Sequence, residues 1–137
     1  MNNTYKQMTI GLLLITHEDI GKQMIEAARV TLNGKLPMQC ETLSVHPDCD
    51  PDEVNQHANA LIESLDSGSG VLVLTDIYGS TPSNIANRCD KSMNIRIIAG
   101  VNLPMLFRIL NYAHLELNEI VDKALSGGHD GIFLCDK

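Results

Sequence analysis

Long apolar runs are missing from this 137-residue sequence. No stretch approaches the roughly 20 apolar residues that a membrane-spanning helix needs, so we expect no direct membrane insertion. The start, MNNTYKQ, is polar and has no apolar core of an export signal. We therefore expect a cytoplasmic protein in which residues 1–7 form a loose arm.

Positive charge is also scarce. Ten Lys and Arg residues stand against 17 Asp and Glu residues, which gives a net charge of −7. Nucleic acids and anionic membrane surfaces both reward Lys and Arg, so neither is expected as a partner. The acidic balance is compatible with a basic protein partner, or simply with solubility.

The sequence has no recognisable metal or nucleotide motif. Its four cysteines form no C-x-x-C pair and fit no zinc spacing; they are Cys40, Cys49, Cys89 and Cys135. No glycine-rich P-loop is present, and no G-x-G-x-x-G follows a strand. We expect no cofactor and no metal, and we interpret the cysteines as reduced structural thiols.

What the sequence does contain is an alternation of apolar runs with helical patterns. The runs predicted as strands cover residues 8–15, 40–45, 71–75 and 94–99, and a short final run, Gly131–Cys135, is a further candidate. Helices are predicted to begin near residues 20, 51, 81, 104 and 117.

Local signals set several boundaries of these helices. Asp50 is predicted as an N-cap, with Pro51 at the first helical position and Glu53 closing a capping box. The stretch DSGSG, residues 66–70, is a turn rather than an interdomain linker, and the last helix is predicted to stop at residues 127–128.

Strands that alternate with helices predict a parallel sheet covered on both faces. The length and the 44% hydrophobic content suit a single domain over residues 1–137. We predict an α/β, flavodoxin-like, open and mainly parallel sheet of order 2-1-3-4, with helices on both faces.

In such a sheet, sites form at the carboxyl ends of the strands where the strand order reverses, here between the first and third strands. His17 follows the first strand and Asp76 follows the third. A carboxylate beside an imidazole fixes which ring nitrogen carries the proton and leaves the other as a directed nucleophile. Two plainer alternatives stay open: His17 as a structural histidine, and Asp76 as a turn residue or helix cap.

The turn after Asp76 suits an anion. Gly79, Ser80 and Thr81 lead into a helix, so backbone N–H groups and hydroxyls can point at a phosphoryl group. Phosphoryl transfer needs positioning and charge stabilisation above all, and such a pocket supplies both.

Three segments resemble one known family, the enzyme IIA component of the mannose class of the bacterial phosphoenolpyruvate-dependent sugar phosphotransferase system. They are IGLLLITHEDIGKQMIEAA at 10–28, GVLVLTDIYGSTPSNIA at 70–86 and IIAGVNLPMLFRIL at 97–110. They occur in the family's order and spacing, and the resemblance covers nearly the whole chain.

The resemblance implies a phosphoryl carrier. His17 would accept the phosphoryl group from phospho-HPr, most readily on its ε nitrogen, and pass it to enzyme IIB. Asp76 would orient the ring, and Thr81, with Ser80 and Gly79, would bind the phosphoryl oxygens. The resemblance also implies a homodimer in which the last strand, here Gly131–Cys135, is exchanged between subunits.

The sequence departs from the family pattern beside the histidine. Glu18 stands where many members have glycine, and a carboxylate there would repel a phosphoryl group unless it points outward. Tyr78 replaces a common tryptophan and Thr81 replaces a serine, which are milder changes. The sequence ends at Lys137 with no enzyme IIB domain, so we expect the acceptor to be a separate protein or to be absent.

Two alternatives in function remain at this point. One is a regulatory protein that senses the phosphorylation state of the sugar system and binds a regulator. The other is a flavodoxin-like cofactor binder. Two positions also stay open as pocket residues or as ordinary ones: His46, after the second strand, and the turn at Asn102.

Overall fold

The computed structural model describes residues 8–90 and 92–136, so the predicted arm at residues 1–7 lies outside the described residues. The strands are β1 (Gly11–His17), β2 (Cys40–Val45), β3 (Val71–Thr75) and β4 (Ile95–Ala99). The helices are α1 (Ile20–Thr31), α2 (Pro51–Leu65), α3 (Thr81–Asn87), α4 (Leu103–Asn111) and α5 (Leu117–Asp130).

The four strands form one parallel sheet in the order β2-β1-β3-β4, as predicted. The first strand lies two to three residues later than predicted, and His17 is its last residue. His17 pairs in register with Val45 at the end of β2, while Ile15 pairs with Thr75 at the end of β3. The carboxyl ends of β1, β2 and β3 therefore lie side by side at the same end of the sheet.

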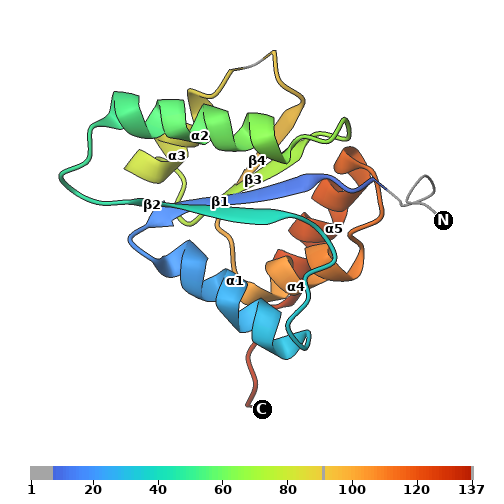
Figure 1. Ribbon diagram of the computed structural model, residues 1–137. Helices are drawn as coiled ribbons and strands as arrows, with labels where there is room; N and C mark the ends of the chain where they lie inside the picture. The colour runs from blue at the N-terminus through green and yellow to red at the C-terminus, as the bar shows by residue number, and fades with distance from the viewer. Residues whose placement is uncertain (1–7, 91, 137) are drawn as a thin grey trace.

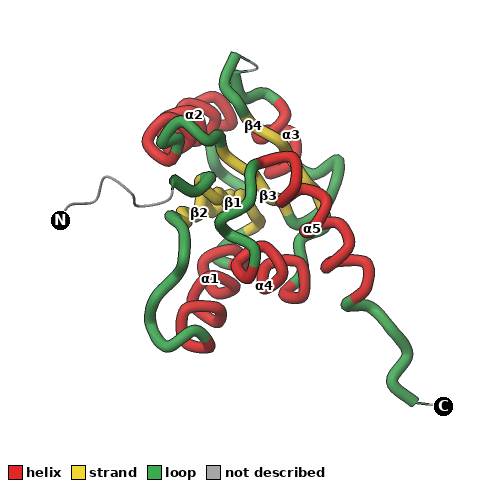
Figure 2. The backbone as a smooth tube through the Cα atoms, turned by 90° about the vertical axis from the view of Figure 1, so that its right-hand side faces the viewer, coloured by secondary structure: helices red, strands yellow, loops and turns green. Residues whose placement is uncertain are grey.

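Helices cover both faces of the sheet, which also confirms the prediction (Figures 1 and 2). Leu12 and Leu14 of β1 pack on the side of α1, α4 and α5. Leu13 and Ile15 of the same strand pack on the side of α2 and α3. All four side chains are fully buried, because successive residues of a strand point to opposite faces and both faces here are covered.

The cap predicted for α2 is present. Asp50 accepts a hydrogen bond from the backbone N–H of Asp52 at 3.0 Å, and Pro51 occupies the first helical position. The prediction of a capping box with Glu53 was wrong: the Asp50 side chain accepts from the N–H of Asp52 and not from that of Glu53. Helix α3 begins at Thr81 with Ser80 as its N-cap residue, one position earlier than the predicted cap.

The last helix does not stop at residues 127–128, and the prediction was wrong there: α5 continues to Asp130. A Cβ on Gly127 would lie 2.6 Å from the Cβ of Arg108 in α4. The two glycines allow close packing of α5 on α4 rather than ending the helix.

The final apolar run forms no strand within the single chain. Residues 132–136 have no regular structure, and Ile132, Phe133 and Leu134 are 74%, 72% and 82% exposed. The run leaves the end of α5 and extends away from the sheet (Figure 2), so it has no strand to pair with. Exchange of this run with a second subunit stays a prediction.

Among residues 8–90 and 92–136, none of the helices has both the length and the apolar character that crossing a membrane requires.

Thr16 joins the end of β1 to the start of α1. Its buried hydroxyl accepts a hydrogen bond from the backbone N–H of Gly21 at 2.8 Å and lies 3.2 Å from the carbonyl oxygen of His17, to which it donates. Asp19, the N-cap residue of α1, makes no side-chain cap bond, so Thr16 supplies that function from the strand.

We predict that Thr16→Val, which keeps the shape but removes the hydroxyl, lowers the free energy of unfolding by about 1–3 kcal/mol, because it leaves the Gly21 N–H without its acceptor. Hydrogen exchange at the Gly21 amide should become faster in this variant and stay protected in the control Thr16→Ser. Equal protection of Gly21 in both variants would contradict the role given to the hydroxyl.

Candidate active site

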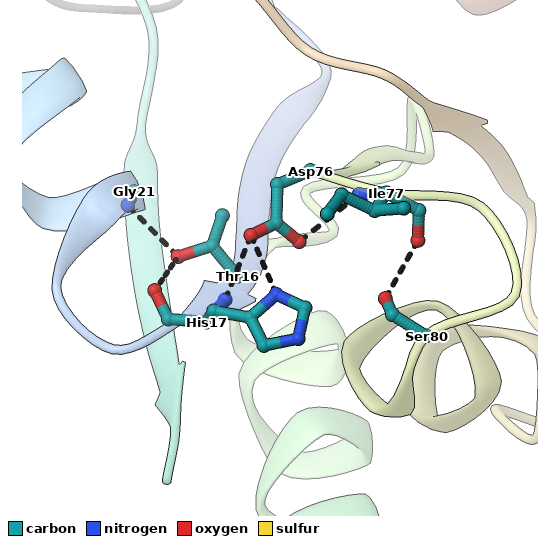
Figure 3. Close-up of polar contacts among 6 residues, drawn as sticks. All are labelled: Thr16, His17, Gly21, Asp76, Ile77 and Ser80. Atoms are coloured by element: carbon teal, nitrogen blue, oxygen red, sulfur yellow. Dashed lines mark hydrogen bonds and ion pairs between the residues drawn. The ribbon is translucent and has the colours of Figure 1, made fainter.

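His17 and Asp76 meet at the carboxyl edge of the sheet, as predicted from strands 59 positions apart in the chain. The Nδ1 atom of His17 lies 2.9 Å from Oδ2 of Asp76 (Figure 3). The same oxygen accepts a second hydrogen bond, at 3.0 Å, from the backbone N–H of His17. The carboxylate thus holds both the ring and the backbone of the residue it orients.

The Asp76 carboxylate is itself fixed. Its other oxygen, Oδ1, accepts a hydrogen bond from the backbone N–H of Ile77 at 3.1 Å. Partial burial tends to raise the pKa of Asp76, but the hydrogen bonds from the backbone and ring of His17 outweigh it and hold the pKa below its usual value. Asp76 is therefore ionised at neutral pH.

An ionised carboxylate can only accept hydrogen bonds, so the Nδ1 atom of His17 must carry the proton in this contact. In the neutral ring, Nε2 then keeps its lone pair. Figure 3 shows Nε2 on the side of the ring that is turned away from Asp76. The His17 side chain is 42% exposed and the Asp76 side chain 11%, so the ring is within reach of a reactant while its partner is covered.

A pocket of about 370 Å³ opens beside the ring. It lies where β1 and β2 end and where α2 and α3 begin. The residues that line it are His17, Glu18, Val45, His46, Pro47, Cys49, Pro51 and Thr81. Thr81 was predicted here, and His46 was left open; the rest of segment 45–51 was missed, although its position after β2 could have indicated the same sheet edge.

The other two residues predicted to bind phosphoryl oxygens shape the turn and are not among the residues that line the pocket. The Ser80 hydroxyl donates a 2.6 Å hydrogen bond to the carbonyl oxygen of Ile77 (Figure 3). Gly79 has φ = 84°, which favours glycine, and an added Cβ there would meet nothing within 4 Å. Their part in phosphoryl binding stays a prediction.

Asn102 does not line this pocket, and it serves as a helix cap. Its side chain accepts a hydrogen bond from the backbone N–H of Met105 at 2.9 Å and donates one to the carbonyl oxygen of Gly128 at 3.1 Å. It therefore begins α4 and ties that helix to α5.

Glu18, the residue that departs from the family pattern, is directed toward β2. Its backbone has φ = 45°, and its N–H donates to the carbonyl oxygen of Val45 at 3.1 Å. Its Oε1 atom lies 2.7 Å from Nδ1 of His46. This contact was not predicted from the sequence, because it depends on a left-handed backbone conformation at Glu18 that no sequence pattern indicates.

Cys40, Cys49, Cys89 and Cys135 all lie within the described residues, and none of them forms a disulfide bond there. Burial, partly opposed by the charge of Arg29, raises the pKa of the Cys40 thiol to about 12, which keeps it protonated and unreactive. Cys49 differs from the other three in lining the pocket.

Comparison with known proteins finds a matching family. The family EIIA-man, described as "PTS system fructose IIA component", matches residues 11–125. The mannose-specific EIIAB component of the phosphotransferase system from Escherichia coli K12 is 30% identical over 129 residues. That alignment covers 91% of this chain but 39% of the relative, so the chain spans well under half of that protein's length.

Solved structures share the fold. The mannose/sorbose-specific IIA subunit from Enterococcus faecalis superposes with a TM-score of 0.83 at 20% identity, covering 95% of this chain and 97% of that one. The IIA protein associated with the fucose utilization operon of Streptococcus pneumoniae gives 0.80 at 22% identity, covering 93% and 94%. With most of the chain matched by the family and a sheet of the same architecture, this protein belongs to the EIIA-man family, the mannose-class enzyme IIA components of the sugar phosphotransferase system.

Proposed function

We propose that this protein is a phosphoryl carrier that accepts a phosphoryl group from phospho-HPr on Nε2 of His17 and passes it to enzyme IIB. The observation that carries the proposal is the 2.9 Å contact between Nδ1 of His17 and Asp76, which leaves Nε2 free beside an open pocket. Membership of the EIIA-man family supports it.

The transfer is a displacement at phosphorus. The Nε2 lone pair of His17 forms the new nitrogen–phosphorus bond while the nitrogen–phosphorus bond of the donor breaks, and the released electron pair stays on the donor imidazole. The His17 ring then carries both the phosphoryl group and the Nδ1 proton, so positive charge builds on it. Asp76 lies where it stabilises that charge and holds the ring in line.

The donor phosphohistidine is already an activated compound, so the protein has only to position the groups and stabilise charge. Thr81 is one of the residues that line the pocket, and we assign binding of the phosphoryl oxygens to its hydroxyl. Gly79 and Ser80 would act through backbone N–H groups, since the Ser80 hydroxyl is bound to Ile77.

Phosphoryl labelling tests whether His17 is the acceptor. With phosphoenolpyruvate, enzyme I and HPr, the wild-type chain should gain one acid-labile phosphoryl group, and His17→Ala should gain none, because the nucleophile is missing. His57→Ala, which changes an exposed histidine of α2, is the control and should be labelled like the wild type. Undiminished labelling of His17→Ala would reject the proposal.

Removal of the Asp76 charge tests the role of that carboxylate. Asp76→Asn keeps the size of the side chain but removes the charge that fixes the Nδ1 proton, so the rate of transfer from phospho-HPr should fall by at least about tenfold. Asp19→Asn is the matched control: Asp19 is an exposed carboxylate near the site that binds the Ser44 hydroxyl and not the ring. A rate loss of the same size in both variants would mean that Asp76 acts only through net charge.

A regulatory protein of this family would pass the same labelling test, so the transfer to enzyme IIB separates the two functions. A carrier should lose its phosphoryl group rapidly to a purified mannose-class enzyme IIB. A regulator would keep it and bind its target in one phosphorylation state only.

We also propose a homodimer that exchanges residues 131–135. The apolar run at Ile132, Phe133 and Leu134 is exposed in the single chain, and β2 and β4 each leave one edge of the sheet unpaired among the described residues. A strand added by a second subunit would cover the run and pair one of these edges.

We predict that sedimentation of the 137-residue chain gives a mass of twice 15.0 kDa, as expected for a dimer. A chain ending at Asp130 should sediment as a monomer. The helical bands of its far-ultraviolet circular dichroism spectrum should be unchanged. The tail supplies the proposed contact, and no described strand contains it. A full-length monomer at micromolar concentration would rule out the exchange.

A further inference from the structure

We propose that Glu18 and His46 act as a charge-compensating pair at the mouth of the pocket, in which protonated His46 allows a phosphoryl dianion to form on His17 beside the Glu18 carboxylate. This role rests on the proposed phosphoryl transfer. It assigns His46 as a positioning residue, and it accounts for the presence of a glutamate next to the acceptor histidine.

The backbone places Glu18 where this problem arises. The residue follows His17 directly, takes the left-handed conformation with φ = 45°, and is held there by the hydrogen bond from its N–H to Val45. A non-glycine residue adopts this conformation only at a steric cost. The side chain is thereby directed toward the end of β2, where His46 stands.

The contact between the Glu18 and His46 side chains determines which nitrogen of His46 carries a proton. The Nδ1 atom of His46 lies 2.7 Å from the Glu18 carboxylate, and the two side chains are 51% and 57% exposed. Because the ionised carboxylate only accepts, Nδ1 of His46 must donate. In the protonated ring, Nε2–H remains as a second donor. Both residues line the same pocket as His17 and Thr81.

The surroundings of His46 favour its protonated form. The hydrogen bond and charge of Glu18, together with the charges of Asp19 and Asp48, raise the pKa of His46. These groups come from the β1–α1 turn and from the loop that holds His46 itself, and the His17 ring faces the pocket from the end of β1. A group with a raised pKa keeps its proton to a higher pH than a free histidine does.

Phosphorylation of His17 changes the electrostatic contribution of the Glu18–His46 ion pair. A surface ion pair contributes little to folding, since it is screened by water and restricts two mobile side chains. A phosphoryl group adds nearly two negative charges at neutral pH, and Glu18 alone would oppose it. The cation of His46 offsets this repulsion, so its effect should appear in the phosphorylated state more than in the stability of the fold.

The test is a double-mutant cycle on the equilibrium of phosphoryl transfer between HPr and the wild type, Glu18→Gln, His46→Gln and the double variant. His46→Gln should lower the transfer constant at pH 7 by roughly threefold to tenfold, as expected for one unit charge near a dianion in an exposed pocket. The double variant should return to within about twofold of the wild type, because the repulsion and its compensation are removed together. Glu26→Gln and His57→Gln, both exposed and away from the pocket lining, are the matched controls and should leave the constant unchanged.

A second readout does not need phosphorylation. In an NMR titration, Glu18→Gln should lower the pKa of His46 relative to the wild type, since the first cause of its raised value is removed. A His46→Gln transfer constant equal to that of the wild type, or a double variant no better than His46→Gln alone, would overturn this role while leaving the carrier function intact. A wild type that is never labelled would overturn the proposed function and this role with it.

Discussion

The hydrogen bond between the His17 ring and the Asp76 carboxylate is the interaction on which the proposed chemistry depends, and it is held by the pairing of β1 with β3. A strand advances about 3.3 Å per residue, so a slip of one position would separate the two side chains beyond hydrogen-bonding distance. Such a slip would also turn the fully buried leucines of β1 to the wrong faces of the sheet. Packing of the core therefore fixes the register between β1 and β3, and this register places His17 beside Asp76.

The pocket beside this pair brings together three segments that have separate structural reasons to be there. The end of β1 delivers the histidine, the first turn of α3 delivers Thr81, and the loop before α2 delivers His46. Negative side chains are frequent around it, among them Glu18, Asp19 and Asp48. A site that receives a phosphoryl group in such surroundings needs a nearby cation. His46, which follows β2, is the residue in contact with the Glu18 carboxylate.

The sequence predicted most of the architecture because its strands are bounded by clear turn and cap signals. The strand order and the approach of His17 to Asp76 followed from the general rule for parallel sheets, without knowledge of any side-chain position. The contact of Glu18 with His46 lay beyond prediction, since it depends on a positive φ at one non-glycine residue. Gly127 was interpreted as a helix end because a glycine that serves packing between α4 and α5 has the same letter as one that ends a helix.

The proposed chemistry requires that Asp76 keep the proton on Nδ1 of His17 and leave Nε2 for phosphorus. The most direct measurement is NMR spectroscopy of the phosphorylated protein with ¹⁵N-labelled histidine, in which the coupling between phosphorus and nitrogen identifies the bonded atom. We predict that phosphorus is bonded to Nε2 of His17 and that Nδ1 still carries hydrogen. Phosphorus on Nδ1, or on any other histidine, would contradict it.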